Sequence, residues 1–317
     1  MSTHHDLPAQ VGTVQWGFYD AAVAPVLTVA SGDTVTVNTL SGTPDNLPPD
    51  NSGFTLLPEH RAVLDGTPRG PGPHLLTGPI AVEGAVPGDA LKIEILDIKL
   101  RQDWGYNLIL PLLGALPEDF PQARIIHIAI DRARGRIRMP WGLEFAAAPF
   151  FGCMGVAPPV GWGRQSSIQP RPFGGNMDNR DLVAGTTLHL PVFHPGGLFS
   201  AGDGHAAQGH GEVNVTAVET ALTGTFRITL EKGASTGLPW AETPGHLMSM
   251  GFDEDLDDAA KQALRAMIAL IRQRTDLSAE DAYTLCSVAA DLIVTQVVDG
   301  NKGIHAMLPL WALSAKG

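Results

Sequence analysis

The sequence predicts a mainly β body followed by a helical C-terminal portion, and three observations support this fold class. Glycine occurs 36 times and proline 25 times in 317 residues, which is typical of many short strands joined by turns. Before residue 235, apolar and polar residues alternate as they do in half-buried strands. After residue 253, apolar residues recur at helical spacing. We therefore expect a β body over 1–235 and an α+β portion packed on it over 236–317.

The first 73 residues are expected to hold short strands and one long loop. Val26–Ala30 and Thr34–Asn38 flank a turn signal at Ser31-Gly-Asp33, a pattern typical of a hairpin. Residues 41–73 are polar and rich in Pro, Gly and Asp, so a long irregular loop is expected there. Within that loop, His60 is interpreted as a solvated residue.

The middle of the chain carries further strand patterns. Glu83 lies in an otherwise apolar stretch, where an unpaired carboxylate would be costly, so it is a candidate functional residue. His74 precedes the same short strand and is either functional or a buried, capping histidine. Strands are expected at Ile80–Glu83, Ala90–Ile98, Arg124–Ile130, Thr187–Phe193, Val213–Val218 and Gly224–Glu231.

Two helices are expected near the end of the chain. The acidic run Asp253–Asp258 precedes apolar residues at helical spacing. It favours a helix N-terminus over a calcium loop, which would need a longer alternation of ligands. Ser278-Ala-Glu-Asp281 resembles a capping box with Asp in the acidic place, and it is expected to begin a second helix that runs to about Val294.

The segment Gly196–Thr216 crowds ionisable and amide side chains onto a glycine-rich stretch between expected strands. Carboxylates and imidazoles so close in sequence could hold a metal ion or perform acid–base chemistry. The alternative is a glycine-rich turn whose polar residues only cap and hydrogen-bond the loop. The candidate residues are Asp203, His205, Gln208, His210 and Glu212.

A second polar cluster lies on the glycine-rich turn Gly174–Leu182. Its Asn176 and Asp178 precede the first cluster across one expected strand, so both clusters could reach the same end of a sheet. The alternative is an Asx-rich turn without function. Cys153 has only apolar neighbours in the sequence, and nothing basic adjoins it to lower its pKa, so it is interpreted as a structural thiol.

Composition and charge exclude several classes of function. A net charge of −12 argues against nucleic acid as a partner. The two cysteines, Cys153 and Cys286, offer no disulfide framework. No apolar run is long enough to span a membrane, and no signal peptide is visible, so we expect a soluble cytoplasmic protein.

The chain resembles the acetamidase/formamidase family of amide hydrolases. The motifs that carry the resemblance run in order along residues 15–310: Thr77-Gly-Pro, Val82-Glu-Gly-Ala, Pro87-Gly-Asp, Pro149-Phe-Phe-Gly, Gly155-Val-Ala-Pro-Pro, Gly174-Gly-Asn-Met-Asp-Asn, Leu190-Pro-Val, Gly202-Asp-Gly-His-Ala-Ala-Gln-Gly, Glu242-Thr-Pro and Thr295-Gln-Val-Val. The resemblance implies a fold of β-sandwich and barrel parts and hydrolysis of a small linear amide to carboxylate and ammonia. It also implies a divalent metal ion, with zinc first and calcium or manganese as alternatives, and a homodimer.

The roles we expect combine this resemblance with the residue types. A metal-activated water would attack the amide, and a carboxylate would relay the proton to the leaving nitrogen. The runner-up reading is a non-catalytic β module that binds a metal or a small ligand. The expected metal ligands are Asp203, His205, Glu212 and Asp178; the expected catalytic residues are Glu83, Glu212 and His74; the expected substrate-binding residues are Asn176, Gln208 and His210.

One position departs from the family pattern. The family usually reads Gly-Asp-Gly-Glu where this chain has Gly209-His-Gly-Glu212, so an acidic residue has become His210. If His210 lies in the site, the lost negative charge should favour zinc-like metals over hard, oxygen-preferring cations, or reshape the pocket for another amide.

Overall fold

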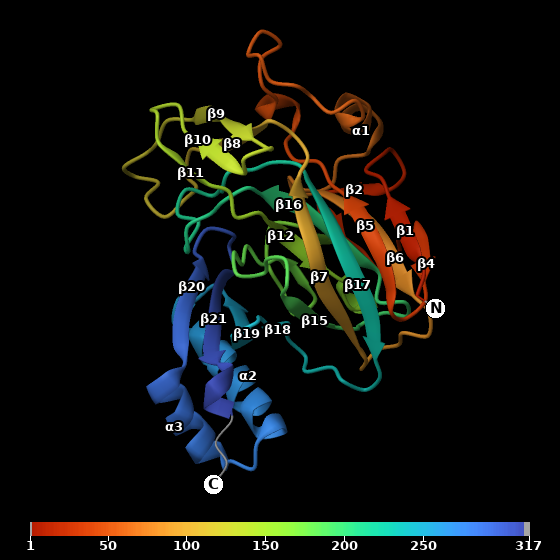
Figure 1. Ribbon diagram of the computed structural model, residues 1–317, viewed down its shortest axis with the longest axis vertical. Helices are drawn as coiled ribbons and strands as arrows, with labels where there is room; N and C mark the ends of the chain where they lie inside the picture. Colours follow the sequence, from red (N-terminus) through yellow and green to blue (C-terminus); the bar gives the residue numbers. More distant parts are fainter. Residues whose placement is uncertain (1, 314–317) are drawn as a thin grey trace.

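Two β-sheets packed face to face form the body of the molecule in the computed structural model, which describes residues 2–313 (Figure 1). The larger sheet has nine strands, and only its β1–β5 pair is parallel. In sheet order its strands are β1 (His4–Leu7), β5 (Asp33–Asn38), β17 (Leu222–Glu231), β7 (Ala90–Leu100), β15 (Thr187–Pro191), β18 (Trp240–Glu242), β19 (His246–Asp253), β21 (Lys302–Pro309) and β20 (Asp291–Gln296).

The second sheet of the body holds the strands that position the polar residues. Strand β4 joins it by pairing in parallel with β6, while the other pairs are antiparallel. In sheet order its strands are β14 (Gly174–Asn176), β12 (Phe150–Gly155), β16 (Phe199–His205), β6 (Leu75–Val82) and β2 (Val14–Trp16), with β4 (Leu27–Val29) beside β6.

The core of the body lies between these two sheets. Strand β5 alternates buried and half-buried residues, as expected for a strand with one face on a core. Phe226 of β17 packs against Phe151 of β12 and Phe199 of β16, with ring centroids 5.5 and 5.7 Å apart. Each fully buried ring contributes roughly 1.5–3 kcal/mol to stability. This packing fixes β12 and β16 firmly against the larger sheet.

A small four-stranded antiparallel sheet lies over one end of the body, at the top of the view in Figure 1. Isolated bridges join Glu219 to Tyr106 in this sheet and to His205 at the end of β16. The small sheet therefore covers the segment that follows β16. Its strands are β11 (Glu144–Ala146), β10 (Arg136–Arg138), β9 (Arg124–Asp131) and β8 (Trp104–Ile109), and a separate pair is formed by β13 (Gln165–Ser166) and β3 (Phe18–Tyr19).

Two helices pack on β19 and β21 of the larger sheet. The Asp255 side chain caps α2 (Leu256–Arg274) by accepting from two backbone N–H groups. The Ser278 hydroxyl caps α3 (Ala279–Ala289) by accepting from Asp281 N at 3.0 Å, and it donates to the Asp281 carboxylate at 2.9 Å. The predicted start of the helix and its Ser278 cap are confirmed, but Asp281 accepts from the Ser278 hydroxyl and not from the Ser278 backbone N–H as a full capping box would require. The short helices are η1 (Pro44–Asn46), α1 (His60–Gly66), η2 (Val160–Trp162) and η3 (Leu310–Leu313).

Strand β19 belongs to two cores at once, because its side chains alternate between its two faces. Met248, Met250 and Phe252 pack into the core of the body. Leu247 packs into a separate core under α2 and α3. On that second face, the Ser249 hydroxyl donates to Ala263 O at 2.7 Å. The C-terminal portion is thus joined to the body through a strand buried on both faces.

The predicted distribution of strands and helices is confirmed, with local corrections. Strands dominate before residue 235, and α2 and α3 follow residue 253. The predicted hairpin is wrong: Val26–Ala30 supplies β4, which pairs with β6, while Thr34–Asn38 supplies β5, which pairs with β1 and β17. A turn signal sets the local bend but not the partner of each strand.

Three other boundaries differ from the prediction. The second long helix ends at Ala289 rather than near Val294, because residues 291–296 form β20 against β21. The expected loop over 41–73 contains the short helix α1. The strand expected over Val213–Val218 is irregular, and its backbone instead follows the edge of the small sheet. The expected division at residue 235 stays a prediction, and β15 pairs with β18 across it.

Among the helices described for residues 2–313, none combines the length and apolar character needed to cross a membrane.

Candidate functional site

The site begins at the end of β16, where Asp203 and His205 lie two residues apart and Asp203 departs from the extended backbone with a φ of 55°. Side chains at this spacing share one face of a strand, as the sequence predicted. His205 Nε2 lies 3.4 Å from Asp203 Oδ2. Gly152 of β12 faces them, and a Cβ at Gly152 would clash with the carboxylates of Asp178 and Asp203. The absence of a side chain there leaves space for three converging polar groups.

His205 is fully buried and contacts acceptors on both sides of its ring. Nδ1–H donates to Gln208 Oε1 at 2.9 Å, and Gln208 Nε2 donates to Asp178 O at 2.8 Å. Nε2 lies 3.2 Å from Glu219 Oε2 but makes no hydrogen bond to any residue of the described range 2–313. Because Gln208 fixes the proton on Nδ1, Nε2 is the atom that the ring presents to the carboxylates.

Neighbouring charges and burial control the ionisation of His205, Asp203 and Glu219. Burial lowers the pKa of His205, but Glu219 and Asp203 outweigh burial and raise that pKa well above its ordinary value. Burial raises the pKa of Asp203, but the rings of His74 and His205 outweigh it and lower that pKa. Burial raises the pKa of Glu219 to about 7. The site therefore holds carboxyl groups of very different acidity within a few ångströms of one another.

Three more carboxyl groups complete the cluster on its other side. Asp178 is 1%, Glu212 5% and Asp299 5% exposed. Both carboxylate oxygens of Asp178, and one each of Glu212 and Asp299, have no hydrogen-bond partner within residues 2–313. Burial, reinforced by mutual repulsion, raises the pKa values of Glu212 and Asp299 well above the ordinary range. Unpartnered buried carboxyl oxygens are costly unless a proton or a cation neutralises them.

The donor set fits a divalent cation. With Asp203 and Glu219, the cluster has five buried carboxyl groups and only two imidazoles, His74 and His205. With all five carboxyl groups ionised, two protonated imidazoles would still leave three negative charges, which must be neutralised by protons or by a cation. Two overlapping ligand groups share His205, and within each group the ligand atoms lie within 4.8 Å of one another: Asp178, His205 and Glu212; and Asp203, His205 and Glu219.

Backbone strain marks the same residues. Asp178, Asp203 and Glu212 have φ values of 48°, 55° and 45°. Such left-handed conformations cost non-glycine residues of order 1–3 kcal/mol and persist only where the surrounding structure enforces them. Only six non-glycine residues between residues 2 and 313 have positive φ, and three of them belong to this cluster. The fold therefore holds these carboxylates in place against a local preference.

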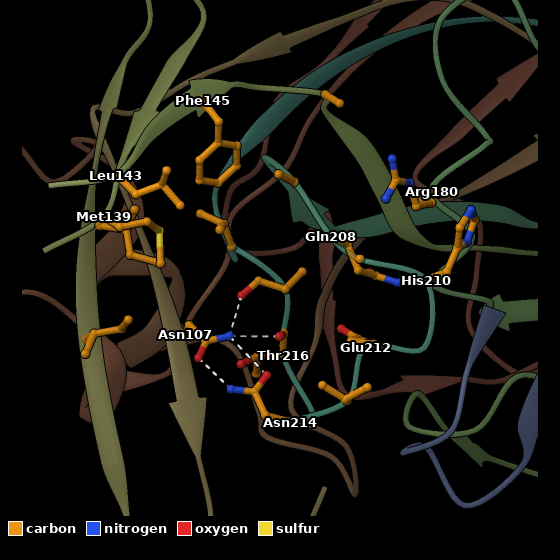
Figure 2. A pocket seen from close by; sticks show the side chains of 18 of the residues that line it. Asn107, Met139, Leu143, Phe145, Arg180, Gln208, His210, Glu212, Asn214 and Thr216 are labelled. Carbon is orange, nitrogen blue, oxygen red and sulfur yellow. Dashed lines mark hydrogen bonds between the residues drawn. The ribbon is translucent and has the colours of Figure 1, made fainter. Parts of the chain in front are cut away.

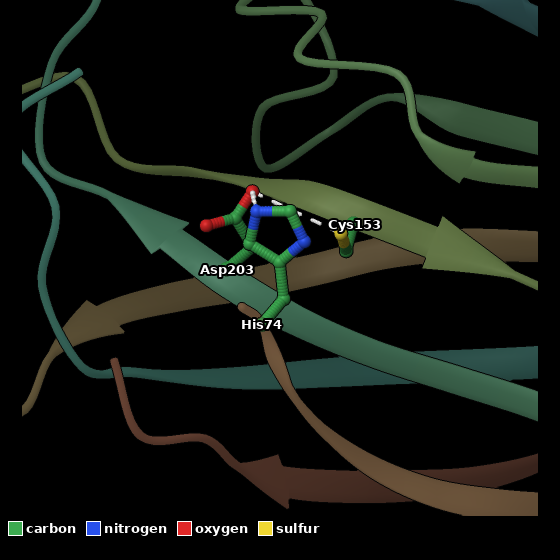
Figure 3. Close-up of side chains that lie close together, drawn as sticks. All are labelled: His74, Cys153 and Asp203. Atoms are coloured by element: carbon green, nitrogen blue, oxygen red, sulfur yellow. Dashed lines mark hydrogen bonds and ion pairs between the residues drawn. The ribbon is translucent and has the colours of Figure 1, made fainter. Parts of the chain in front are cut away.

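His74 and Cys153 flank Asp203, as Figure 3 shows. His74 Nε2 lies 3.8 Å from Asp203 Oδ2, while its Nδ1 lies 2.9 Å from Ser167 Oγ. The Cys153 thiol donates to Asn176 Oδ1 at 3.0 Å. Burial and the nearby carboxylates raise the pKa of Cys153 well above its ordinary value, so the thiol stays protonated. This environment agrees with the expected structural thiol rather than a nucleophile.

A cavity of about 300 Å³ opens onto the cluster. His74, Asn176 and the carboxyl groups of Asp203, Glu212, Glu219 and Asp299 line its polar side. Leucine and valine residues, among them Leu108, Leu113 and Val215, also line the cavity. A cavity with apolar walls and a few convergent polar groups suits a small, partly apolar molecule.

A second cavity of about 540 Å³ lies between the small sheet and the segment after β16 (Figure 2). Met139, Leu143 and Phe145 line one side of it, and Gln208 and His210 line the other. Glu212 lines both cavities. It is therefore a carboxylate at the boundary between them.

The structure brings most of the expected site residues together and leaves two outside. The Glu83 side chain is exposed in the turn after β6, so water solvates its charge and it needs no partner. His74 and Glu83 flank this eight-residue strand at its two ends, roughly 30 Å apart along an extended chain. His210 lies beside Asp181 and His305 rather than in the carboxylate cluster. The residues that do meet are Asp178, Asp203, His205 and Glu212, with His74, Asn176 and Gln208 in contact with them or lining the cavity.

Sequence reasoning missed Glu219 and Asp299. Glu219 stands in the apolar run Ala217-Val-Glu-Thr-Ala-Leu222, so the argument applied to Glu83 would have found it. Asp299 follows Val297-Val298 and reads as an ordinary turn residue before glycine, and only the fold carries it to Asp178.

Comparisons with known proteins agree with the motifs. A model of the acetamidase/formamidase family matches residues 11–163 and 159–311. The chain is 33% identical to an acetamidase from Bacillus halodurans, whose crystal structure aligns over 98% of both chains with a TM-score of 0.84. A predicted acetamidase/formamidase from the thermophile Thermoanaerobacter tengcongensis is 29% identical, with a TM-score of 0.85 over 99% of this chain and 98% of that one. The acetamidase of Mycolicibacterium smegmatis is 26% identical over 44% of this chain and 49% of its own length. The chain thus spans about half the length of the curated relatives it matches.

Proposed function

The chain belongs to the acetamidase/formamidase family, and from this premise we propose that it hydrolyses the C–N bond of a small linear amide to carboxylate and ammonia. The observation that carries the proposal is the buried carboxyl cluster around His205, which opens onto a cavity of about 300 Å³. Amide hydrolysis needs a nucleophile, a polarised carbonyl and a proton for the leaving nitrogen.

We propose that a divalent metal ion, zinc first, occupies this cluster, with calcium and manganese as alternatives. Asp178, Asp203, His205 and Glu212 would hold it, and the two orphaned oxygens of Asp178 support this set. When bound, such an ion lowers the pKa of a water and polarises a carbonyl. Gln208 would hold the His205 ring in place through Nδ1, and Glu219 would add a negative charge beside Nε2, close to the ion.

Glu212 is the residue proposed to move the proton. Its unpartnered Oε2 is buried and borders the cavity. Burial and repulsion by Asp178 raise its pKa. A raised pKa makes a carboxylate a stronger base toward a water proton, and the resulting carboxyl group can then pass that proton to the leaving nitrogen. Glu83, the other expected base, is too far away to act.

The amide side chains have positioning roles in this proposal. Gln208 uses both ends of its carboxamide to orient His205 and to hold Asp178 O. Asn176 accepts from Cys153 and donates to Ile168 O at 3.2 Å while lining the cavity. Direct substrate contacts of Asn176, Gln208 and His210 stay predictions.

Ammonia release tests the proposal. The purified protein should release ammonia from formamide, acetamide or a longer linear amide when zinc, calcium or manganese is supplied. Metal analysis of protein purified without chelator should find bound metal. Metal binding without ammonia from any amide of a broad panel would instead establish a non-catalytic binding module.

A homodimer is proposed as the assembled form. The segment after β8 exposes large apolar side chains: Leu112 is 87%, Leu116 56% and Phe120 54% exposed. Such a group of apolar residues is typical of a surface covered by a second subunit. Sedimentation should give twice the chain mass of 33.5 kDa, and a monomer would contradict it. A cytoplasmic location stays a prediction from the sequence.

A further inference from the structure

A second group of ligand-type side chains lies outside the carboxyl cluster. Asp181 Oδ2 is 3.1 Å from His305 Nε2 and 3.6 Å from His210 Nε2. The three ligand atoms lie within 4.8 Å of one another, and the two imidazole centroids are 5.5 Å apart. The residues come from three separate segments: the turn after β14, the segment after β16, and strand β21.

We propose that Asp181, His210 and His305 form a second cation site, specific for zinc-like divalent metals and distinct from the carboxyl cluster. Tetrahedral zinc binds imidazole nitrogen and carboxylate oxygen at about 2.0–2.2 Å, which places neighbouring ligand atoms a little over 3 Å apart. The two separations from Asp181 Oδ2 match this spacing closely.

The buried histidine of this group is already oriented by a hydroxyl. His305 is 0% exposed, and Thr295 Oγ1 lies 2.7 Å from its Nδ1. Without a cation, Nε2–H donates to Asp181 Oδ2 at 3.1 Å and Nδ1 accepts from the Thr295 hydroxyl. A cation would displace the Nε2 proton, and the Thr295 hydroxyl can then accept from Nδ1–H, which leaves the Nε2 lone pair for the cation. Histidines that bind metals are commonly held by a hydrogen bond from the other ring nitrogen, which fixes the tautomer.

His210 supplies the open side of the site. No hydrogen bond involves its ring among residues 2–313, although Nε2 lies beside Asp181. The His210 side chain is 34% exposed and borders the 540 Å³ cavity (Figure 2). A cation on these three ligands would therefore keep a coordination position facing the cavity. Such an open position distinguishes reactive or exchangeable zinc sites from closed structural ones.

The chemistry of the donors selects the class of cation. Two imidazoles and one carboxylate suit zinc, nickel or cobalt, whereas calcium and magnesium prefer six or more oxygen ligands. Arg180 also lines the cavity, but it is exposed, so solvent screens its charge from the site.

Zinc here would join loop and sheet next to the carboxyl cluster. His210 is two residues from Glu212, and Asp181 is three residues from Asp178. Between His210 and Glu212, Gly211 N donates to Thr295 O at 2.9 Å and so attaches this segment to β20. Occupancy would cross-link the segments that carry two of the cluster's carboxyl groups.

The test is zinc stoichiometry of the full chain, measured without substrate so that it does not depend on amide hydrolysis. Chelator-treated protein is titrated with zinc by calorimetry, and zinc is counted after gel filtration. His210→Ala is the main variant because the side chain is partly exposed and its removal leaves the core intact. Asp181→Asn is the second variant. His194→Ala is the matched control, because His194 lies outside the candidate ligand groups formed by the described residues.

Wild type and His194→Ala should each hold one zinc equivalent more than His210→Ala or Asp181→Asn. Where residual binding is measurable, zinc affinity at this site should fall by roughly 10- to 100-fold or more. Calcium titrations should not distinguish the variants. Equal zinc content and affinity in His210→Ala, Asp181→Asn and the control, with folding confirmed by circular dichroism, would overturn the proposal.

Discussion

Glu219 shows how one side chain can act through another. Its Oε2 lies 3.2 Å from His205 Nε2, while its Oε1 accepts from Ala217 N at 2.9 Å. The backbone N–H thus fixes the carboxylate on one side so that the other oxygen faces the ring. Removal of its charge changes the environment of His205 without removing a ring nitrogen.

Glu219→Gln should lower bound metal and amide hydrolysis together. The amide keeps the shape of the side chain but removes its negative charge. That charge is one of those in the buried cluster that would balance a bound cation. We expect metal affinity to fall by roughly 10-fold or more, because the lost charge lies among the ligand atoms themselves and not behind them. Metal content and ammonia release are the measurements. Glu83→Gln is the matched control, and an equal loss in both variants would rule out a local role for Glu219.

His60 is the residue at which the expectation of a solvated loop was wrong. It begins α1, is 0% exposed, and stacks on Trp104 with ring centroids 6.2 Å apart. Burial lowers the pKa of His60 to about 4 from an ordinary value of 6.5. The ring is therefore neutral in the folded protein at neutral pH.

Stability should fall between pH 6.5 and 4 because of His60. In this window the unfolded chain binds a proton that the folded chain does not, so acid favours unfolding. The loss approaches about 3 kcal/mol by pH 4, from a shift of this size. Denaturant unfolding at pH 7 and pH 4.5 measures it. His60→Leu should show a smaller acid loss than wild type, whereas His194→Leu should not; equal losses in all three would contradict the assignment.

The sequence predicted the polar residues of the site better than their grouping. Asp203 and His205 were predictable because two residues on a strand share a face. His210 was not, because its distance from the carboxyl cluster depends on how the segment after β16 bends. Asp299 and Glu219 come from separate parts of the chain, and no spacing in the sequence reports that they meet.

At the scale of elements, β12 contributes an empty position rather than a side chain. Gly152 faces Asp178, Asp203 and His205, and its backbone is not in the left-handed region. Any residue with a Cβ fits the backbone there but not the cluster.

Gly152→Ala should abolish metal binding and activity while the sandwich still folds. The added methyl group would push apart Asp178 and Asp203, which are buried and cannot move into solvent. Metal content, ammonia release and near-UV circular dichroism measure the effect. Gly245→Ala serves as control, since a Cβ there meets no atom within 4 Å. Normal metal content in Gly152→Ala would show that the carboxylates do not act together.

Strand type was predictable from periodicity, but strand partners were not. The segments that became β7, β9 and β17 alternate clearly, and all three form. β4 and β5 follow one another around a proper turn yet enter different sheets. Pairing is decided by the core that each strand can cover, and this information is spread over the whole chain.

At the scale of the molecule, the double burial of β19 links the body to the C-terminal portion. Because one face of β19 packs in each core, neither core can open without exposing the strand. Residue 235 therefore marks where the sequence pattern changes from strand-like to helical spacing, and the two cores on either side of it are expected to unfold together.

Calorimetric unfolding of the full chain should show one cooperative transition. A fragment of residues 236–317 should self-associate, because it would expose Met248, Met250 and Phe252. Sedimentation of the fragment checks this second expectation. Two well-separated transitions, together with a monomeric folded fragment, would instead establish two domains.

The positive φ angles of Asp178, Asp203 and Glu212 affect which substitutions this chain can accept during evolution. Exchange of Asp for Asn or Gly at φ values of 48° and 55° needs one nucleotide change and keeps or relaxes the backbone. It also removes repulsion among buried carboxyl groups, so the altered protein should melt at a higher temperature than the metal-free parent. Selection for stability alone would then erase the site while preserving the fold. We therefore expect that single substitutions of this sequence can yield proteins that keep the β-sandwich but no longer bind a metal ion.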